Sequence, residues 1–349
     1  MRAQCVLLLS TLLLAACGPT KTAVPKEPTT FRGPVPIVIA HRGASGYLPE
    51  HTAESKVLAH GMRADFIEQD VVLTRDNAAI VLHDVQIDTV TDVASRFPRR
   101  QRTDGRYYAV DFDLAEIAQL NVHERADPKT GKLIFPNRFN PRSVRFGVRL
   151  LSEEIALLAG LNASTRRVVG LYTEIKAPAW HRAQGKDITR IVLDTLKDAG
   201  LQLRTDPVWV QCYDPAELRR IRTEFESDLK LVQLIGDNRW GDANVDFDQL
   251  RTPQGLASIR EYADAIGVWI PHVVQWPKPG GEPTFSTLVR DARAAGLRVH
   301  VYTLRRDQLP ANAPDFSTVH AALLQAGVDG IFTDFPDETR AFVVRPQLQ

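Results

Sequence analysis

The sequence predicts an α/β fold, a (β/α)8 TIM barrel with a long insertion after its second strand. From residue 35 onward, short runs rich in β-branched residues alternate with stretches of helical character, which is typical of βα units on a parallel sheet. Eight such runs can be counted, and the eighth ends close to the C-terminus. Because eight parallel strands close a barrel, the pattern predicts one barrel domain over residues 35–349.

The composition of the 349-residue chain is that of an ordinary globular protein, with 44% hydrophobic and 24% charged residues, which is enough apolar material for a full core. Lys and Arg number 43 against 42 Asp and Glu, which gives a formal net charge of +1. Proteins that bind nucleic acid usually carry a basic excess or a basic stripe, so no nucleic-acid partner is expected. Three cysteines are too few for a disulfide scaffold or a cysteine-rich zinc module.

The first 34 residues predict export and attachment to a membrane. Arg2 precedes an apolar run that is too short to span a bilayer as a stable helix but suits a signal peptide over 1–16. The run ends in Leu14-Ala15-Ala16-Cys17, which resembles a bacterial lipobox, in which the cysteine is lipidated. Prolines then interrupt a polar stretch, which predicts a flexible tether over 17–34 that begins at the lipidated Cys17.

The predicted mature protein is therefore an exported lipoprotein that faces the periplasm or the cell surface. The lipid anchor is its only expected membrane attachment, because no later stretch of the sequence is long and apolar enough to cross a bilayer. An ordinary cleaved signal peptide with a chance cysteine at position 17 is the alternative. The sequence predicts no particular oligomeric state.

The elements of the barrel follow in order from residue 35. The first two strands, over 35–40 and 66–73, enclose a helix over 52–60, and the same alternation repeats toward the C-terminus. Further strands are expected over 168–175, 208–213, 230–235, 265–270, 298–304 and 330–333, and further helices over 152–159, 188–199, 215–226, 286–295 and 318–326. Glycine often stops a helix, and the glycines placed as stops are Gly61, Gly160, Gly200, Gly296 and Gly327.

One interval breaks the alternation. About 95 residues separate the second and third strands, whereas a simple βα unit needs about 30. An extra extended run over 78–82 leads to His83, and the rest, about residues 84–149, is rich in arginine and has weak periodicity. We expect an insertion at one end of the barrel, over the loops that follow the strands.

Polar side chains gather where the predicted strands end, which is where a barrel of this kind carries its reactive groups. Glu68 and Asp70 are two residues apart on the second strand and therefore share one face. The first and third predicted strands and the extra run over 78–82 also lead into charged residues or histidine. We expect all of these side chains to converge at one rim, and they are His41, Arg42, Glu68, Asp70, His83, Glu174 and Lys176.

Three of these residues predict a metal site. Unpaired carboxylates are costly to bury, so Glu68, Asp70 and Glu174 pointing into one barrel call for a cation. Their hard oxygen donors suit Ca²⁺ or Mg²⁺ and not zinc or copper. Calcium is favoured because it is abundant outside the cytoplasm, with Mg²⁺ as the alternative.

Each of these residues also has a structural interpretation. His41 alone could be a satisfied core histidine, and Glu174 and Lys176 could pair with each other and have no further role. The shared position at one rim argues against this. The other seven histidines have no comparable neighbours in the sequence, and we assign them structural or surface roles, although His51 lies close to the rim; the other six are His60, His123, His181, His272, His300 and His320.

The motifs around these residues resemble the signature of glycerophosphodiester phosphodiesterases, and the bacterial periplasmic, calcium-dependent branch most closely. The resemblance covers nearly everything from Val35 onward and includes the long insertion. The motifs that carry it are His41-Arg42-Gly43-Ala44-Ser45-Gly46, Pro49-Glu50-His51-Thr52, Ala64-Asp65-Phe66-Ile67-Glu68-Gln69-Asp70-Val71, Val81-Leu82-His83-Asp84, Glu174-Ile175-Lys176 and Thr333-Asp334.

The resemblance implies a role for each rim residue. His41 and His83 would form an acid–base pair, and the three carboxylates would hold the metal. Arg42 and Lys176 would contact the phosphate. Two departures from the family pattern, Cys212 in place of a common serine and Tyr302 in place of a frequent tryptophan, bear on substrate fit and not on the reaction.

The activity that the resemblance implies is metal-dependent hydrolysis of glycerophosphodiesters, such as glycerophosphocholine and glycerophosphoethanolamine. The products would be sn-glycerol 3-phosphate and an alcohol. Two other functions stay open at this point: a tethered phospholipase that acts on intact lipids, and a surface binding protein or adhesin that keeps the fold without turnover.

Overall fold

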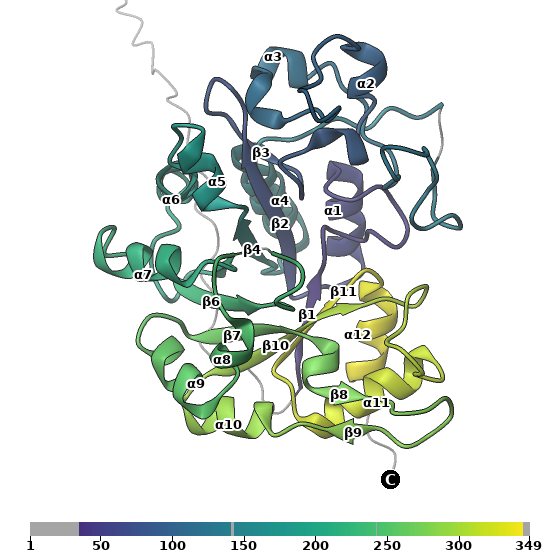
Figure 1. The fold of residues 1–349 in the computed structure, drawn as a ribbon, viewed down its shortest axis with the longest axis vertical. Coiled ribbons are helices and arrows are strands. Elements are labelled where there is room, and N and C mark those ends of the chain that lie inside the picture. The colour runs from purple at the N-terminus through teal and green to yellow at the C-terminus, as the bar shows by residue number, and fades with distance from the viewer. Residues whose placement is uncertain (1–34, 141–142, 242, 345–349) are drawn as a thin grey trace, which may run out of the picture.

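The computed structural model describes residues 35–140, 143–241 and 243–344, so the predicted signal peptide, the lipidated Cys17 and the tether lie outside the described residues. Eight parallel strands form a closed barrel (Figure 1). β1 (Ile37–Ala40) pairs with β11 (Gly330–Thr333) on one side and with β2 (Phe66–Leu73) on the other, so the sheet returns to its first strand. This closure confirms the predicted (β/α)8 fold.

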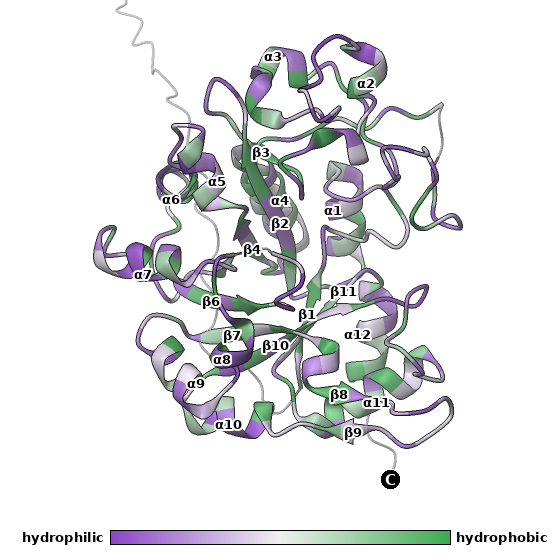
Figure 2. Ribbon diagram, viewed as in Figure 1, coloured by the Kyte–Doolittle hydropathy of each residue, from purple (hydrophilic) through white to green (hydrophobic). Residues whose placement is uncertain are grey.

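The eight predicted strands all form, and their ends differ from the prediction by at most two residues. Nearly every residue in them is buried, because one face of each strand meets the barrel interior and the other meets the helices. Figure 2 accordingly shows the central strands as largely hydrophobic. The strands between β2 and β11 are β4 (Gly170–Ile175), β5 (Val208–Cys212), β6 (Lys230–Ile235), β7 (Ala265–Trp269) and β10 (Arg298–Leu304), and a separate short pair is formed by β8 (Val274–Gln275) and β9 (Thr284–Phe285).

Helices alternate with the strands and cover the outside of the barrel (Figure 1). Several begin at a side chain that caps the first turn: Thr52 accepts a hydrogen bond from the backbone N–H of Ser55, and Asp315 accepts one from that of Thr318. The predicted helices form as α1 (Ala53–Gly61), α4 (Leu151–Thr165), α6 (Ile188–Asp198), α7 (Pro215–Thr223), α10 (Leu288–Ala294) and α11 (Phe316–Ala326).

Four helices outside the insertion are absent from the prediction. Two of them, with six and four residues, are too short for apolar periodicity to reveal. Three begin with proline, whose fixed φ suits the first helical position, and Thr252 caps one of these three by accepting from the backbone N–H of Gly255. The four are α5 (Pro178–Ala183), α8 (Phe247–Leu250), α9 (Pro253–Arg260) and α12 (Pro336–Val344).

The prediction that Gly160 stops a helix is wrong, because α4 continues to Thr165. The side chain of Asn162, in this last part of α4, is buried and bonds both backbone groups of Val169, accepting from its N–H at 3.1 Å and donating to its C=O at 2.9 Å. The helix must extend past Gly160 to place Asn162 there. Gly200, Gly296 and Gly327 follow their helices with φ near +80°, as stop positions require.

The chain between β2 and α4 forms a layer of its own at one end of the barrel, at the top of Figure 1. β3 (Ala79–Val81) pairs antiparallel with β2, and short helices follow, among them α2 (Val93–Arg96) and α3 (Leu114–Ile117). A second hydrophobic cluster, distinct from the main core, holds this layer together; it includes Val72, Ile80, Leu82, Val93 and Phe112.

Large side chains fill the part of the barrel interior that lies away from the ends of the strands. Tyr172 is fully buried among Phe66, Trp209 and Phe332, and its hydroxyl lies 2.7 Å from Nδ1 of His300. This packing confines open space to the end of the barrel where the strands finish. Among the described residues, no helix is long and apolar enough to cross a membrane.

Candidate active site

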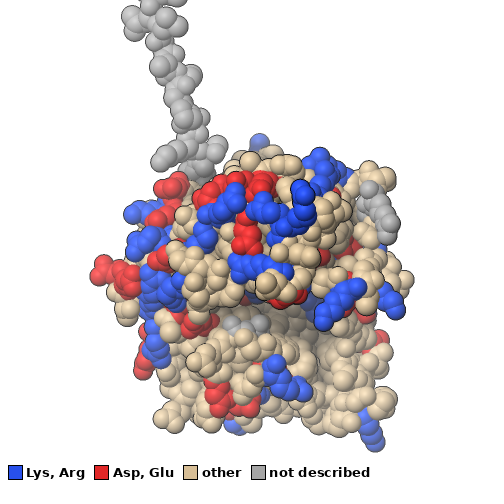
Figure 3. Space-filling model, turned by 45° about the horizontal axis from the view of Figure 1, so that its top comes forward, with Lys and Arg blue, Asp and Glu red and all other residues tan. Residues whose placement is uncertain are grey.

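A cavity of about 620 Å³ opens where the strands of the barrel end, and all seven of the predicted rim residues line it. Glu68 and Asp70 lie within β2, Glu174 lies near the end of β4, and the other four residues follow β1, β3 or β4. Figure 3 shows acidic and basic side chains mixed over the upper part of the molecule, above a hollow whose lower wall is mostly uncharged. Segments far apart in the sequence therefore bring their polar groups to one place.

The three acidic residues lie on neighbouring strands. Glu68 and Asp70 are on β2, and the Cα of Asp70 is paired with that of Glu174 on β4. All three side chains are buried. Oε2 of Glu68 accepts a hydrogen bond of 2.6 Å from the backbone N–H of Arg42, and Oε1 of Glu174 accepts one of 2.7 Å from Nζ of Lys176.

Burial and mutual repulsion disfavour the charged forms of these carboxylates. Burial, together with the neighbouring Asp70, raises the pKa of Glu68 well above its usual range, and burial raises the pKa of Glu174 to about 8. Burial acts in the same direction on Asp70, but His83, Lys176 and a hydrogen bond from His51 outweigh it and hold the pKa of Asp70 well below its usual range. A cation would stabilise the charged form of all three.

The geometry around Asp70 fits a divalent cation. Oδ1 of Asp70 is buried and has no hydrogen-bond partner among the described residues. Ligand atoms of His51, Glu68 and Asp70 all lie within 4.8 Å of one another, whereas Glu174 is adjacent to Asp70 across the strand pair. The donors are mostly carboxylate oxygens, which suit Ca²⁺ or Mg²⁺.

His51 belongs to the site, and its assignment to a structural or surface role on the sequence missed this contact. Its Nε2 lies 2.8 Å from Oδ2 of Asp70, and its Nδ1 lies 3.4 Å from Nζ of Lys56. Lys56 can only donate, so Nδ1 accepts and Nε2 carries the proton that Asp70 accepts. In this tautomer the ring of His51 orients Asp70, and neither ring nitrogen is free to bind a metal.

His41 and His83, the two histidines at the rim, each have a carboxylate oxygen next to Nδ1. Nδ1 of His41 lies 2.7 Å from Oδ1 of Asp334, and Nδ1 of His83 lies 2.5 Å from Oδ1 of Asp84. A carboxylate at Nδ1 fixes the proton on that nitrogen and leaves Nε2 to face the cavity. Burial, with Arg42 close by, lowers the pKa of both rings to about 4, so both are neutral at pH 7. Each can therefore accept a proton at Nε2.

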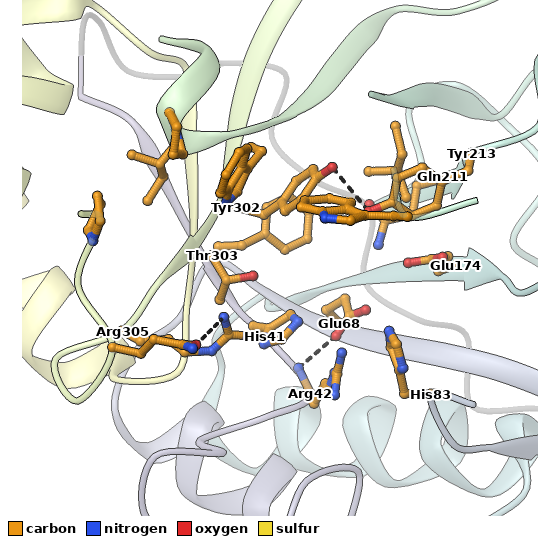
Figure 4. Close-up of a pocket in the computed structure, with 18 of the residues that line it drawn as sticks. His41, Arg42, Glu68, His83, Glu174, Gln211, Tyr213, Tyr302, Thr303 and Arg305 are labelled. Atoms are coloured by element: carbon orange, nitrogen blue, oxygen red, sulfur yellow. Dashed lines mark hydrogen bonds between the residues drawn. The ribbon is translucent and has the colours of Figure 1, made fainter. Parts of the chain in front are cut away.

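Cationic side chains complete this end of the cavity. Arg42 donates from Nη1 to Glu50 at 2.9 Å, and its Nε is 3.3 Å from Oδ2 of Asp70. Its φ of +56° is a left-handed conformation, which goes with the backbone hydrogen bond to Glu68. Nζ of Lys176 lies 3.2 Å from Nε2 of His83. Figure 4 shows His41, Arg42, Glu68 and His83 together on one side of the cavity.

The opposite wall is aromatic, and only Tyr302 of this wall was singled out in the sequence. Tyr213 donates from its hydroxyl to that of Tyr302 at 3.0 Å, and the two residues face the charged end across the cavity in Figure 4. Trp240 and Trp269 meet edge to face with ring centroids 5.3 Å apart. Cys212, the other departure from the family pattern, is buried against the carbonyl of Ile175 and is absent from the lining of the cavity.

Comparison with known proteins gives a consistent result. The model of the "Glycerophosphoryl diester phosphodiesterase family" matches residues 41–338. A protein of Haemophilus influenzae named glycerophosphodiester phosphodiesterase is 42% identical over 86% of this chain and 88% of its own length. A protein of Treponema pallidum with the same name is 36% identical over 89% of this chain and 92% of its own.

Solved structures share the fold. The crystal structure of a glycerophosphodiester phosphodiesterase from Agrobacterium tumefaciens superposes with a TM-score of 0.56 at 19% identity, over 88% of this chain and 99% of that one. A phosphodiesterase of Oleispira antarctica, solved in complex with its product sn-glycerol 3-phosphate, has a TM-score of 0.59 at 18% identity, over 88% of this chain and 97% of that one.

Proposed function

Since the chain belongs to the glycerophosphoryl diester phosphodiesterase family and is a glycerophosphodiester phosphodiesterase, we propose that it hydrolyses small diesters such as glycerophosphocholine and glycerophosphoethanolamine. The products are sn-glycerol 3-phosphate and the free alcohol. We propose further that the reaction needs one divalent cation and that His41 and His83 transfer the protons. The curated relatives named above give no support to the phospholipase or the adhesin.

The arrangement of the two imidazoles is the observation that carries this proposal. Each ring has a carboxylate at Nδ1 and lines the same cavity, and each therefore presents Nε2 to a bound ester. In the view of Figure 4, Glu68 and Arg42 are seen between His41 and His83. One imidazole that accepts a proton and one that donates a proton, beside an acidic and a cationic group, suit the hydrolysis of a phosphodiester.

The histidines divide the proton transfers between them. One takes a proton at Nε2 from the attacking hydroxyl. The other is protonated when the anionic ester is bound, and it donates to the leaving oxygen. Each transfer of this kind is typically worth about 10²- to 10⁴-fold in rate. Lys176 donates to His83 in the free enzyme, and a bound phosphate would take over that donor.

Glu68, Asp70 and Glu174 would hold the cation. When bound, a divalent ion of this kind supplies Lewis-acid stabilisation of charge on the phosphoryl oxygens. Arg42 and Lys176 add two fixed cationic contacts to the same group. We propose Ca²⁺ as the ion and Mg²⁺ as the alternative, since both prefer oxygen donors.

The aromatic wall supports a preference on the alcohol side of the ester. Trp240, Trp269 and Tyr213 offer ring faces, and among the described residues that line this wall none carries a carboxylate. A primary ammonium such as ethanolamine needs hydrogen-bond acceptors, whereas a trimethylammonium group binds to aromatic faces through cation–π attraction. We therefore propose that glycerophosphocholine is the preferred diester.

The experiment is release of sn-glycerol 3-phosphate from purified full-length protein. We expect release from glycerophosphocholine, glycerophosphoethanolamine and glycerophosphoglycerol, loss of release in EGTA, and recovery with excess Ca²⁺. Full activity in EGTA that is lost only in EDTA would assign the site to Mg²⁺ instead, and full activity in both chelators would contradict metal dependence. Release of phosphatidic acid from intact phosphatidylcholine at a comparable rate would contradict the proposed substrate class.

We also propose that the protein is exported and held at a membrane by lipid on Cys17. The support is the lipobox-like Leu14-Ala15-Ala16-Cys17 and the proline-interrupted stretch that follows it. In this arrangement the barrel meets small diesters on the far side of the inner membrane.

A further inference from the structure

Two arginines of the insertion lie just behind the active site. Arg125 and Arg138 belong to the segment between β3 and α4, and neither lines the cavity. Their side chains are nonetheless 17% and 5% exposed, far less than is usual for surface arginines. Each one bonds to a carboxylate that itself bonds to one of the two rim histidines.

Arg138 lies behind His41. Its Nη2 donates to Oδ2 of Asp334 at 2.7 Å, and the other oxygen of Asp334 contacts Nδ1 of His41. Nε and Nη2 of Arg138 also donate to both oxygens of Asp307, at 2.8 and 2.9 Å, and the ring of Phe135 lies 3.7 Å from its guanidinium carbon. The guanidinium is therefore fixed on three sides, and it fixes Asp334 in turn.

Arg138 also contacts the backbone next to His41. Its Nη1 donates to the carbonyl of Ser45 at 3.2 Å, and the hydroxyl of Ser45 donates to the carbonyl of His41 at 2.8 Å. Both the ring and the backbone of His41 are thus linked to one side chain of the insertion.

Arg125 lies behind His83 in the same way. Its Nη1 donates to Oδ2 of Asp84 at 2.6 Å, while the other oxygen of Asp84 contacts Nδ1 of His83. Its Nε and Nη2 donate to both oxygens of Glu50, at 3.0 and 2.6 Å. Glu50 also accepts from Nη1 of Arg42. Arg125 therefore links a histidine and the rim arginine to one guanidinium.

From these contacts we propose that Arg125 and Arg138 are positioning residues: they hold Asp84 and Asp334 against the two histidines, and this is the contribution of the insertion to the reaction. The inference rests on the proposed roles of His41 and His83. Asp334 is buried and Asp84 is 24% exposed, and in both a second donor helps to keep the charge and the orientation of a carboxylate that faces a histidine. The barrel supplies one such donor, Nε of Arg305, to Asp334 at 2.8 Å. The insertion supplies Arg138 to Asp334 and Arg125 to Asp84.

The two arginines should affect the kinetic constants differently. Arg138 reaches the site only through His41 and its partners, so Arg138→Gln should lower kcat about 10- to 100-fold, the usual result of a misplaced catalytic group, and leave KM within about twofold. Arg125 also holds Arg42, which we expect to contact the phosphate. Arg125→Gln should therefore lower kcat by a similar factor and raise KM at least about threefold.

Steady-state kinetics on glycerophosphocholine test this in the full-length protein, with thermal unfolding measured for each variant. Arg102→Gln is the matched control: Arg102 is in the same insertion, its Nε and Nη2 donate to both oxygens of Asp111 at 2.7 and 2.8 Å, and it is absent from the cavity lining. We expect Arg102→Gln to keep wild-type kcat and KM. Wild-type kcat in Arg125→Gln and Arg138→Gln would overturn the inference.

Arg138→Lys keeps the charge but loses the planar fork, and it decides the question if Arg138→Gln does not fold. A folded Arg138→Lys protein with kcat reduced and KM unchanged supports a positioning role, and wild-type kcat in this variant overturns it. A loss of activity in either arginine variant that merely follows a lowered unfolding temperature, or that also occurs in Arg102→Gln, overturns it as well. These outcomes are all read against an active wild-type enzyme, so they are separate from a failure of the proposed function.

Discussion

His41 and His83 come from different strands and yet are built alike, which decides what their removal should do. Each ring is neutral at pH 7 because burial lowers its pKa to about 4, and each is oriented by a carboxylate at Nδ1. The carboxylate at Nδ1, with Nε2 left toward the cavity, is what suits each ring to proton transfer. This carboxylate also distinguishes His41 and His83 from His300, which lies against Tyr172 in the filled part of the barrel interior.

We predict that His41→Ala and His83→Ala each lower kcat for glycerophosphocholine by about 10²- to 10⁴-fold, because each removes one proton transfer. Circular dichroism and the unfolding temperature should stay close to wild type, since both side chains border a cavity. His123→Ala is the control: its Nδ1 contacts only the backbone carbonyl of Glu124 at 2.8 Å, and the residue is absent from the cavity lining. Wild-type rates in both rim variants would contradict the assignment.

The residues that lie at the rim could be predicted from the sequence, but the side chains that they contact could not. The rim residues follow or end β-branched runs, and barrel geometry places such positions together. His51 lies in the loop between β1 and α1, with φ at +61°, and neither periodicity nor strand position indicates it. The signals in the sequence are the closeness of His51 to the predicted rim and the motif Pro49-Glu50-His51-Thr52, and neither identifies Asp70 as the partner of the histidine.

At the scale of elements, the loop after β6 controls the aromatic wall. Gly236 directly follows β6, and a Cβ there would come within 2.9 Å of the Trp240 ring and 3.2 Å of the Tyr213 ring. A glycine is therefore what allows both rings to approach this loop closely. Trp240 is 44% exposed and also contacts Trp269, so its ring lies at the mouth of the cavity.

We predict that Trp240→Ala lowers kcat/KM for glycerophosphocholine about tenfold, because a cation–π contact is worth about 0.5–2 kcal/mol. The kcat/KM for glycerophosphoglycerol, which has no cation, should change less than twofold. The measurement is the ratio of the two kcat/KM values.

Two further variants test whether the effect of Trp240→Ala comes from the loss of an aromatic ring face at the cavity. Trp240→Phe should keep most of the preference for choline, because a ring face remains. Phe285→Ala removes another exposed aromatic residue, 39% accessible and absent from the cavity lining, and should leave the ratio unchanged. An equal loss on both diesters in Trp240→Ala would show a structural effect and contradict recognition of the cation.

Strands were easier to predict than helix ends or the insertion. Most of the barrel strands are short apolar runs, and in β2 apolar residues flank Glu68, Gln69 and Asp70, so this pattern located all eight strands to within two residues. Helix ends depend on tertiary contacts, as Asn162 shows by carrying α4 past Gly160. In the insertion, Arg125 and Arg138 look like any other arginines in the sequence, because their roles follow from partners far away in the chain.

At the scale of the whole molecule, barrel closure assembles the site. β1 and β11 are the first and last strands and yet are neighbours, so His41 meets Asp334 although 293 positions separate them. The count of eight strands predicts this adjacency, which is why a shared rim could be expected from the sequence. The distances within the rim depend on side-chain packing, which the sequence pattern does not specify.

The predicted anchor is also a property of the whole molecule. We predict that Cys17→Ala moves the protein from the membrane fraction to the soluble fraction and abolishes incorporation of labelled palmitate, because the cysteine is the proposed lipid attachment site. Activity on a soluble diester should be unchanged, since the barrel is intact. Cys212→Ala, which alters a buried thiol, is the control and should stay with the membranes. Retention of Cys17→Ala in the membrane fraction would contradict the anchor.

The meeting of the first and last strands also bears on synthesis. The proposed metal ligands Glu68, Asp70 and Glu174 all precede Asp334, the partner of His41, which follows β11. The surroundings of His41 are therefore complete only when the last barrel strand has been synthesised and has paired with the first. We expect a chain truncated before β11 to lack the carboxylate that orients His41.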